Sequence, residues 1–395
     1  MPVRSFTMVL VRIGAQLANE VRVKIKSIEP FAASLPMKKT VTMAGETVVK
    51  ADNVFVRIET DTGIVGWGEA ASAPTMTGET VASMMAAVFH IKPVLIGRAA
   101  DGFAAISAAM DDAMYGNSAA KAAIEIALHD AAARATGRPL NALFGGRQRT
   151  RIPVLAVIGS TDQEADIREA RDRWGAGYRA FKIKVGIASA EADAARTQAI
   201  CRALKAEREP CLVSADANQG FSVDEALRYV AGLADCGLDF FEQPVRADNL
   251  DGMARVSAAS SVPIGADEGI HSLADIERHR AQGAAAGVSL KAIKLGGLRA
   301  LYEACQLCDR LGMKVNVSCK TGESSVASAA ALHLAAAVPM LAWGLTLTSS
   351  GLAEDAVREP LRIEGGHAVV PDGNGLGVDV DEQRLRSGQQ TRMVA

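Results

Sequence analysis

The chain has 395 residues, which is long enough to bury one large barrel domain or two smaller domains. Its formal net charge is −2 and only 4% of its residues are aromatic, so neither a nucleic-acid partner nor a membrane surface is indicated. Arg12 interrupts the apolar stretch within residues 1–20, which are predicted to be an N-terminal extension rather than a signal peptide. The longest later apolar segment, Leu332–Leu347, is short and broken by Pro339, so it is not predicted to span a membrane. These features fit a cytoplasmic protein.

Six cysteines are spread through the chain, and only Cys305 and Cys308 lie close together. Their segment, LYEACQLCDR, is predicted to be helical. A zinc site would need a second pair of ligands at a suitable spacing, and the sequence offers none. We therefore expect buried free thiols, as in a protein of the reducing cytoplasm.

Residues 21–148 mix strand-like and helix-like patterns and are predicted to form an α+β domain. The strand segments are predicted at 21–30 and 53–70. Between them we expect a long loop around Leu35–Lys50, and the second segment contains a turn at Asp61–Gly63. A helix is predicted from Asn117, as its N-cap, to about Thr136.

From residue 149 onward, short apolar runs recur at intervals of roughly 20 to 35 residues, each followed by a helical stretch. The eight runs are PVLAVI, YRAFKIKV, CLVSADA, LDFFEQP, VPIGAD, VSLKAIK, KVNVSC and MLAWGL. Eight β/α units predict an α/β fold with a TIM-type barrel over 149–362, whose functional groups lie at the C-terminal ends of the strands. A doubly wound sheet is disfavoured because no glycine-rich fingerprint follows the first strand. The tail, 363–395, is expected to pack back on the N-terminal domain.

Charged residues stand where several predicted strands end. Three successive strands end at or next to the carboxylates Asp216, Glu242 and Asp267. An unpaired charge beside an apolar strand is costly, so the repeated placement favours one shared site over three separate salt bridges. Several carboxylates, with positions left for water and substrate, suit Mg²⁺ better than zinc or copper. We therefore expect a magnesium site here, with Mn²⁺ as an alternative ion.

Lysines flank this expected metal site on two sides. Strand alternation in KIK places Lys182 and Lys184 on the same face, and the sixth strand carries Lys291 and Lys294. Removing a proton α to a carboxylate creates a dianionic enediolate, whose charge a divalent cation stabilises. A lysine among other positive charges loses its own proton more readily and can act as a base. The pattern thus predicts proton transfer on a small-molecule carboxylate substrate.

These motifs together resemble the enolase superfamily and, within it, the muconate lactonizing enzyme subgroup of the mandelate racemase/muconate lactonizing enzyme family. The matching segments, in chain order, are VFVRIETDTGIVGWGEA, NSAAKAAIEIALHD, LFGG, KIK, DAN, FEQP, ADEGI, LKAIKLGG, GESSVASAAALH and PDGNGLGVDVDE. Each motif alone is weak, and their order and spacing carry the resemblance over nearly everything after Val21. It implies a modified TIM barrel, (β/α)7β, with an α+β capping domain completed by the C-terminal segment, and assembly into a homo-oligomer.

The resemblance also implies individual roles. The implied magnesium ligands are Asp216, Glu242 and Asp267, and the implied acid/base residues are Lys184 and Lys291. The implied substrate-binding and supporting residues are Lys182, Asn218, Glu268 and Glu323. Lys291 is preferred to Lys294 because it stands five residues before Gly296, the first glycine of the GG pair. A mandelate-racemase type of site is disfavoured, since VNVSCKTGESS contains no histidine.

Several side chains keep two interpretations. Glu323 is either a functional acid or a charge favoured by the dipole at a helix N-terminus. Cys319 and Lys320 are predicted to lie near the barrel mouth. There they either contact the substrate, or Lys320 is a loop lysine that faces solvent. His129 and His333 fall within alanine-rich helices and are predicted to be packing residues.

Substrate specificity is expected to come from the capping domain, through loops near Pro36–Gly45 and Ala73–Thr80. Within the first loop, Lys38 and Lys39 either meet an acidic distal group of the substrate or face solvent. The sequence predicts an isomerase: a racemase or epimerase of an N-acyl amino acid or dipeptide, or a cycloisomerase of a muconate-like dienoate. The alternatives are a dehydratase of a hydroxylated acid or hydroxyproline-like imino acid that uses the same lysines, and a non-catalytic carboxylate-binding homologue.

Overall fold

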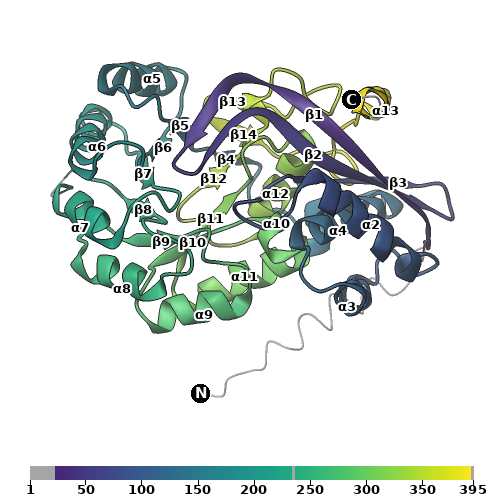
Figure 1. Cartoon of the computed structure of the whole chain (residues 1–395). Helices are drawn as coiled ribbons and strands as arrows, with labels where there is room; N and C mark the ends of the chain where they lie inside the picture. The colour runs from purple at the N-terminus through teal and green to yellow at the C-terminus, as the bar shows by residue number, and fades with distance from the viewer. Residues whose placement is uncertain (1–22, 234–235, 393–395) are drawn as a thin grey trace, which may run out of the picture.

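The computed structural model describes residues 23–233 and 236–392. The extension predicted for residues 1–20 lies outside the described residues. Figure 1 shows a capping part, built from the first strands and helices, beside a barrel whose helices lie outside its strands. None of the described helices is both long and apolar enough to cross a membrane.

The capping part is built on a three-stranded antiparallel sheet. Its strands are β1 (Ile25–Met43), β2 (Glu46–Thr60) and β3 (Val65–Ala71). Its helices are α2 (Val81–Leu95), α3 (Phe103–Ala113) and α4 (Ser118–Ala135), followed by the 3-10 helix η1 (Leu140–Phe144). Buried valine, isoleucine and alanine side chains of the sheet and helices form a shared core. The turn predicted at Asp61–Gly63 is confirmed, because β2 and β3 pair directly across it.

The segment 35–50, expected to be a loop, is a hairpin instead. After a register shift at Pro36, β1 and β2 pair again from Val41 opposite Val48 to the turn at Ala44–Gly45. The expectation was wrong because alternating β-branched residues form a strand even when much of their surface stays exposed. The hairpin extends from the capping sheet toward the barrel (Figure 1).

Helix α4 has nearly the predicted bounds, but Asn117 does not cap it. Asn117 occupies the N-cap position with a left-handed φ of 54°, and its side chain makes no capping hydrogen bond. The carboxylate of Glu79 accepts hydrogen bonds from Ala119 N at 2.8 Å and Ala120 N at 3.0 Å. A carboxylate suits the unpaired N–H groups and positive dipole end of a helix, so it takes the role predicted for Asn117.

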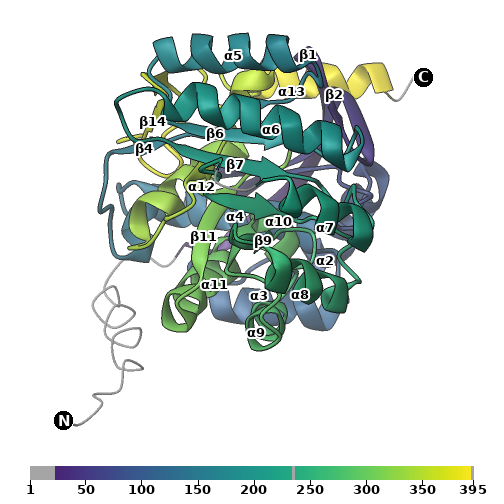
Figure 2. The same ribbon diagram turned by 90° about the vertical axis from the view of Figure 1, so that its left-hand side faces the viewer.

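The second part is a parallel barrel, as predicted. Its strands are β5 (Ala156–Ile158), β6 (Ala180–Lys184), β7 (Leu212–Asp216), β8 (Phe240–Glu242), β9 (Ile264–Ala266), β10 (Gly287–Leu290), β11 (Lys314–Ser318) and β12 (Leu345–Thr346). A parallel bridge between Val154 and Leu345 joins the two ends of this sheet. The helices that follow β5 to β11 are α5 (Gln163–Gly175), α6 (Ala190–Lys205), α7 (Val223–Ala231), α8 (Leu250–Ala259), α9 (Leu273–Ala281), α10 (Ala292–Leu295) with α11 (Leu298–Leu311), and α12 (Ser325–Ala337). Figure 2 shows α5 to α9 outside the barrel strands, and the arrangement is the expected (β/α)7β.

The last strand begins later than predicted. The run MLAWGL contributes only Leu345 to β12. Gly344 has a left-handed φ of 74°, which breaks the extended backbone. Trp343, just before it, is buried and stacks on Phe240 with ring centroids 4.1 Å apart. Trp343 therefore fills the core instead of extending the strand, and Met340 and Ala342 are exposed.

The last described helix lies against the capping sheet. A small sheet joins β4 (Arg151–Pro153), β13 (Ile363–Glu364) and β14 (His367–Val369), the 3-10 helix η2 (Ser349–Gly351) precedes β13, and α13 (Glu382–Arg392) follows β14. On α13, Arg386 forms an ion pair with Glu29 of β1 at 3.1 Å, and its guanidinium lies over the Phe31 ring. Figure 1 shows α13 beside β1.

Candidate active site

A cavity of about 760 Å³ lies where the barrel strands end, below the β1–β2 hairpin. The predicted site residues that line it are Lys182, Lys184, Asp216, Asn218, Glu242, Asp267, Glu268 and Lys291. They meet because all strands of a parallel barrel end on the same face. Glu323, the remaining predicted residue, lies outside this lining.

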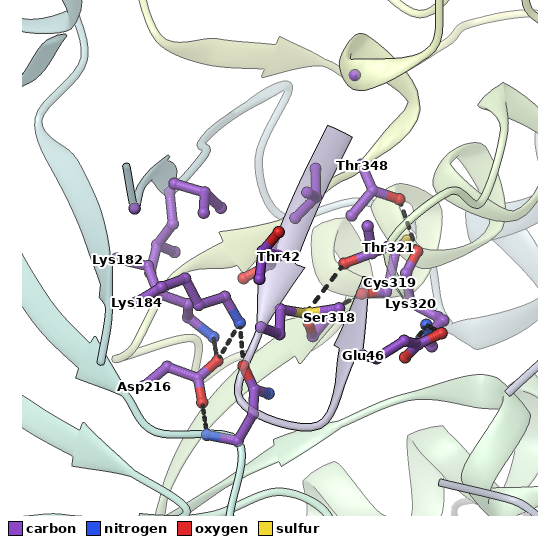
Figure 3. A pocket seen from close by; sticks show the side chains of 18 of the residues that line it. Thr42, Glu46, Lys182, Lys184, Asp216, Ser318, Cys319, Lys320, Thr321 and Thr348 are labelled. Atoms are coloured by element: carbon purple, nitrogen blue, oxygen red, sulfur yellow. Dashed lines mark hydrogen bonds and ion pairs between the residues drawn. The ribbon is translucent and has the colours of Figure 1, made fainter. Parts of the chain in front are cut away.

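Strands β6, β7 and β8 place two lysines against two carboxylates, and Figure 3 shows Lys182 and Lys184 beside the first of these, Asp216. Lys184 Nζ is 2.7 Å from Asp216 Oδ2, and Lys182 Nζ is 2.6 Å from Glu242 Oε2. Asp216 and Glu242 are partners in the β7–β8 register. Because residues two apart on a strand share a face, both lysines point inward, and each is more than nine-tenths buried.

Asp267 follows β9 and bonds to two lysines. Lys291 Nζ and Lys294 Nζ both donate to its carboxylate, Lys294 at 2.5 Å from Oδ1. Lys291 lines the cavity, whereas Lys294 is 1% exposed and also donates to Ser289 O. Burial lowers the pKa of Lys291, but the Asp267 charge outweighs it and the pKa is raised overall. Because β6 and β10 are four strands apart in an eight-stranded barrel, Lys184 and Lys291 stand on opposite sides.

Burial and neighbouring charges shift the pKa values of the acidic groups in different directions. For Asp216 and Asp267, burial favours the protonated form, but the adjacent lysine ammonium groups outweigh it and lower both pKa values. For Glu242, burial prevails and raises the pKa. Burial, and then the charges of Asp267 and Asp216, raise the pKa of Glu268 to about 7. The site is therefore a buried mixture of charges held by mutual pairing.

The acidic residues fit a magnesium ion by donor type. Hard carboxylate oxygens are the ligands that Mg²⁺ prefers, and Glu242 Oε1 and Glu268 Oε2 are buried without a hydrogen-bond partner in the described part of the chain. A cation would satisfy such atoms. As the side chains stand in residues 23–233 and 236–392, no three acidic, histidine or cysteine groups form a ready metal site. Lysines bond to all three predicted ligands, Asp216, Glu242 and Asp267.

Two amide side chains hydrogen-bond to residues of this site. Asn218 Oδ1 accepts from Lys184 Nζ at 2.6 Å, and its Nδ2 donates to Glu268 Oε1 at 3.1 Å. Gln243 was not predicted, and its Oε1 accepts from Asp267 N at 2.8 Å. Both amides have left-handed φ values, 42° for Asn218 and 35° for Gln243, a strained conformation typical of functional sites. Its place in the strand-end motif FEQP, directly after Glu242, could have indicated Gln243 as a site residue.

The hairpin and the β11–α12 loop form the other wall of the cavity. Figure 3 shows Lys182, Lys184 and Asp216 at one end of the group and Glu46 with Lys320 at the other. Lys320 Nζ donates to Glu46 Oε2 at 3.0 Å and Oε1 at 3.2 Å, and its side chain is 5% exposed. The solvated alternative for Lys320 is therefore wrong, because Glu46 of the hairpin reaches it. Glu46 was missed, although Gly45 between alternating β-branched residues is a hairpin signal.

Both capping segments expected to control specificity reach the cavity. Lys38 and Lys39 are exposed at its rim, and Thr75 of the second segment also lines it. Lys39 pairs with Glu169 at 3.1 Å, and Lys38 donates to a backbone carbonyl. Contact with substrate remains a prediction for these side chains.

Glu323 lies just before α12 and therefore at a helix N-terminus, as one of its two interpretations requires. Its carboxylate is buried and accepts from Lys320 N at 2.9 Å. Burial raises its pKa to about 7. A role as a functional acid stays a prediction.

The two helix histidines pack as predicted. His129 stacks on Phe103 with ring centroids 3.9 Å apart and on Phe144 at 5.4 Å. His333 Nδ1 accepts from Asn141 Nδ2 at 2.8 Å, so its Nε2 donates to a backbone carbonyl. All six cysteines are free, and most are buried.

Comparison with known proteins identifies the family. Residues 27–145 match the mandelate racemase/muconate lactonizing enzyme N-terminal domain, and residues 165–384 match the enolase C-terminal domain-like family. A chloromuconate cycloisomerase of Cupriavidus necator is 32% identical over 371 residues, 92% of this chain and 98% of that protein.

Solved structures agree with these matches. The muconate lactonizing enzyme from Pseudomonas fluorescens, complexed with muconolactone, superposes with a TM-score of 0.88 at 31% identity, covering 93% of this chain and 100% of that one. A dipeptide epimerase from Enterococcus faecalis, complexed with Mg and L-Leu-L-Tyr, gives 0.84 at 29% identity, covering 90% and 99%. The chain is therefore an enzyme of the enolase superfamily and belongs to its mandelate racemase/muconate lactonizing enzyme family of isomerases.

Proposed function

We propose that the protein is a magnesium-dependent isomerase that moves a proton on the carbon beside a substrate carboxylate. The observation that carries this proposal is that Lys184 and Lys291 enter one cavity from opposite strands of the barrel. Acidic groups fill the strand ends between them. A base on each side allows a proton to leave one face of a carbon and return to the other, which racemisation and epimerisation require.

Each residue of the site has its own proposed role in this reaction. Lys182 orients the substrate carboxylate by charge, while Lys184 and Lys291 accept or donate the α-proton at their Nζ atoms. Asn218 and Asp216 hold the Lys184 ammonium in the cavity.

The proposed ion would be held by Asp216, Glu242 and Asp267. When bound, Mg²⁺ would supply a Lewis acid that stabilises the negative charge developing on the substrate carboxylate. The magnesium reported in the Enterococcus faecalis epimerase structure supports this choice of ion.

The substrate class we propose is an N-acyl amino acid, a dipeptide or a muconate-like dicarboxylate. The similarity to a chloromuconate cycloisomerase and to a dipeptide epimerase supports this range. Lys38 and Lys39, exposed at the rim, would meet an acidic distal group of such a substrate.

A proton-exchange screen in D₂O tests the proposal. The enzyme with Mg²⁺ is incubated with panels of these three classes, and NMR follows the α-carbon. We expect deuterium to enter at the α-carbon with carbon connectivity preserved or cyclised, and a chelator to stop this until Mg²⁺ is restored. Elimination of water from hydroxylated acids, without α-exchange of the other classes, would identify a lyase instead.

A further inference from the structure

A buried arginine stands directly behind Lys184. Arg196 lies on α6, is 4% exposed, and its guanidinium donates to Lys184 O at 2.5 Å. The same guanidinium donates to Asp166 Oδ2 at 2.5 Å and Asp193 Oδ1 at 2.9 Å. Both aspartates are fully buried. Arg196 thus connects the backbone of β6 to acidic groups of α5 and α6.

The two aspartates extend this connection to the chain on either side. Asp166 Oδ1 accepts from Ser160 N at 2.8 Å and Ser160 Oγ at 2.7 Å, just after β5. Asp193 Oδ2 accepts from Gly186 N at 2.8 Å, two residues after Lys184. The cluster therefore fixes the ends of two adjacent strands.

Such a cluster is a poor means of stabilising a core. Burying three charges carries a large desolvation penalty, and well-packed apolar side chains often serve stability as well or better. A guanidinium does offer several N–H donors in a rigid plane, which fixes the direction of each acceptor. The observed contacts use that property to hold a backbone carbonyl in place.

The side chain of Lys184 is guided as well. A Cβ atom on Gly159 would lie 2.9 Å from Lys184 Cβ, so the lysine stem passes close to the neighbouring strand. Its Nζ bonds to Asp216 and Asn218. The orientation of the ammonium therefore depends on how the backbone of Lys184 is held.

Lys291 is held differently. Its carbonyl accepts from Lys294 N at 3.2 Å and Leu295 N at 3.3 Å, both backbone groups of the short helix α10. Disturbing Arg196 should therefore affect one lysine and spare the other.

We propose that Arg196, anchored by Asp166 and Asp193, is a positioning residue for Lys184. It fixes the backbone from which Lys184 reaches the α-carbon of the substrate. This inference rests on the proposed acid/base function of Lys184 and Lys291, and it adds a residue that touches neither substrate nor metal.

The test measures α-proton exchange with each lysine acting alone. Arg196→Lys is introduced into a Lys291→Ala background, where exchange depends on Lys184, and into a Lys184→Ala background, where it depends on Lys291. The probe is the compound that exchanges fastest in the wild-type D₂O screen, supplied as a racemate so that each background meets the enantiomer that its remaining lysine exchanges. Arg149→Lys is the matched control, because Arg149 also donates to backbone carbonyls, those of Ala335 and Val338. Circular dichroism and thermal unfolding confirm that each variant is folded.

We expect Arg196→Lys to slow exchange at least tenfold in the Lys291→Ala background and to leave it within twofold in the Lys184→Ala background. Asp193→Asn, which keeps the guanidinium, should give the same asymmetry in weaker form. Equal slowing in both backgrounds, or none in either, overturns the inference while leaving the proposed function standing. Absence of exchange from every compound with the wild-type enzyme overturns the proposed function and this inference with it.

Discussion

Single residues in this site are stabilised by partners that are themselves buried. The buried lysines and acids at the strand ends of the barrel pair with one another. Removing one of them weakens the compensation of its partner's buried charge. Asp216 and Asp267 are buried, but each faces two lysines, which lower their pKa values, whereas Glu242 pairs with Lys182 alone and burial raises its pKa. A divalent cation among them would compete with the ammonium groups for the same oxygens.

Magnesium binding can be tested without turnover. An ion that binds only the folded state stabilises it by about 2.7 kcal/mol at a concentration one hundred times its dissociation constant. We expect Mg²⁺ to raise the thermal midpoint of the wild type and of Glu169→Gln, a carboxylate at the cavity rim. The shift should vanish in Asp216→Asn combined with Glu242→Gln. An equal shift in all three proteins would place the ion elsewhere.

His333 predicts a pH dependence of stability. Burial, with a smaller effect of the Arg147 charge, lowers its pKa to about 4, and a proton on Nδ1 would face the donor Nδ2 of Asn141. Between pH 6.5 and 4 the unfolded chain takes up a proton that the folded chain does not, so stability falls as pH falls. The loss should be roughly 3 kcal/mol.

Denaturant unfolding at several pH values checks this contribution. The difference in stability between the wild type and His333→Gln should change by this amount between pH 6.5 and 4, whereas the difference between the wild type and His90→Gln, at an exposed histidine, should stay constant. A difference between the wild type and His333→Gln that does not change with pH would contradict the assignment.

Among the structural elements, the β1–β2 hairpin is the one that completes the cavity, and small residues let it dock. A Cβ on Gly220 would lie 2.6 Å from Ala44 Cβ, and one on Gly322 would lie 2.7 Å from Ala51 Cβ. These contacts fall on loops from two different sides of the barrel. The ion pair between Glu46 and Lys320 adds a polar contact beside the second one.

Gly322→Ala is expected to disturb this docking. The added methyl group would overlap Ala51, and the φ of +93° at this position is unfavourable for alanine. Overpacking of this kind costs about 1–3 kcal/mol, and the lifted hairpin should raise KM for the substrate. Gly45→Ala is the control, because no atom lies within 4 Å of its added Cβ. Unchanged stability and KM in Gly322→Ala would show that the hairpin does not depend on this contact.

At the scale of the whole molecule, the barrel and its strand-end charges could be predicted because their signals are local and repeated. Each β/α unit carries its own apolar run, and acids such as Asp216 and Glu242 directly end these runs. Strand alternation alone places Lys182 and Lys184 on one face. Parallel closure then brings all the strand ends together.

Contacts between distant segments could not be predicted in the same way. Glu46 and Lys320 are 274 residues apart, and the local sequence around each residue does not indicate that the two side chains will pair. Arg196 lies in a charged helix whose pattern does not distinguish a buried arginine from a solvated one. The cap of α4 by Glu79 likewise depends on how two helices meet. Such partners are chosen by tertiary packing.

The central claim is that two opposed lysines each serve one face of the same carbon. Its most direct test is α-proton exchange in D₂O with Lys184→Ala and Lys291→Ala, using the separate enantiomers of a substrate that the wild type racemises. We expect each variant to lose racemisation by at least a thousandfold, a loss of roughly 4 kcal/mol of transition-state stabilisation. Each should still exchange one enantiomer, and the two variants should exchange opposite enantiomers. Exchange of the same enantiomer by both variants, or racemisation that survives in either one, would contradict the account.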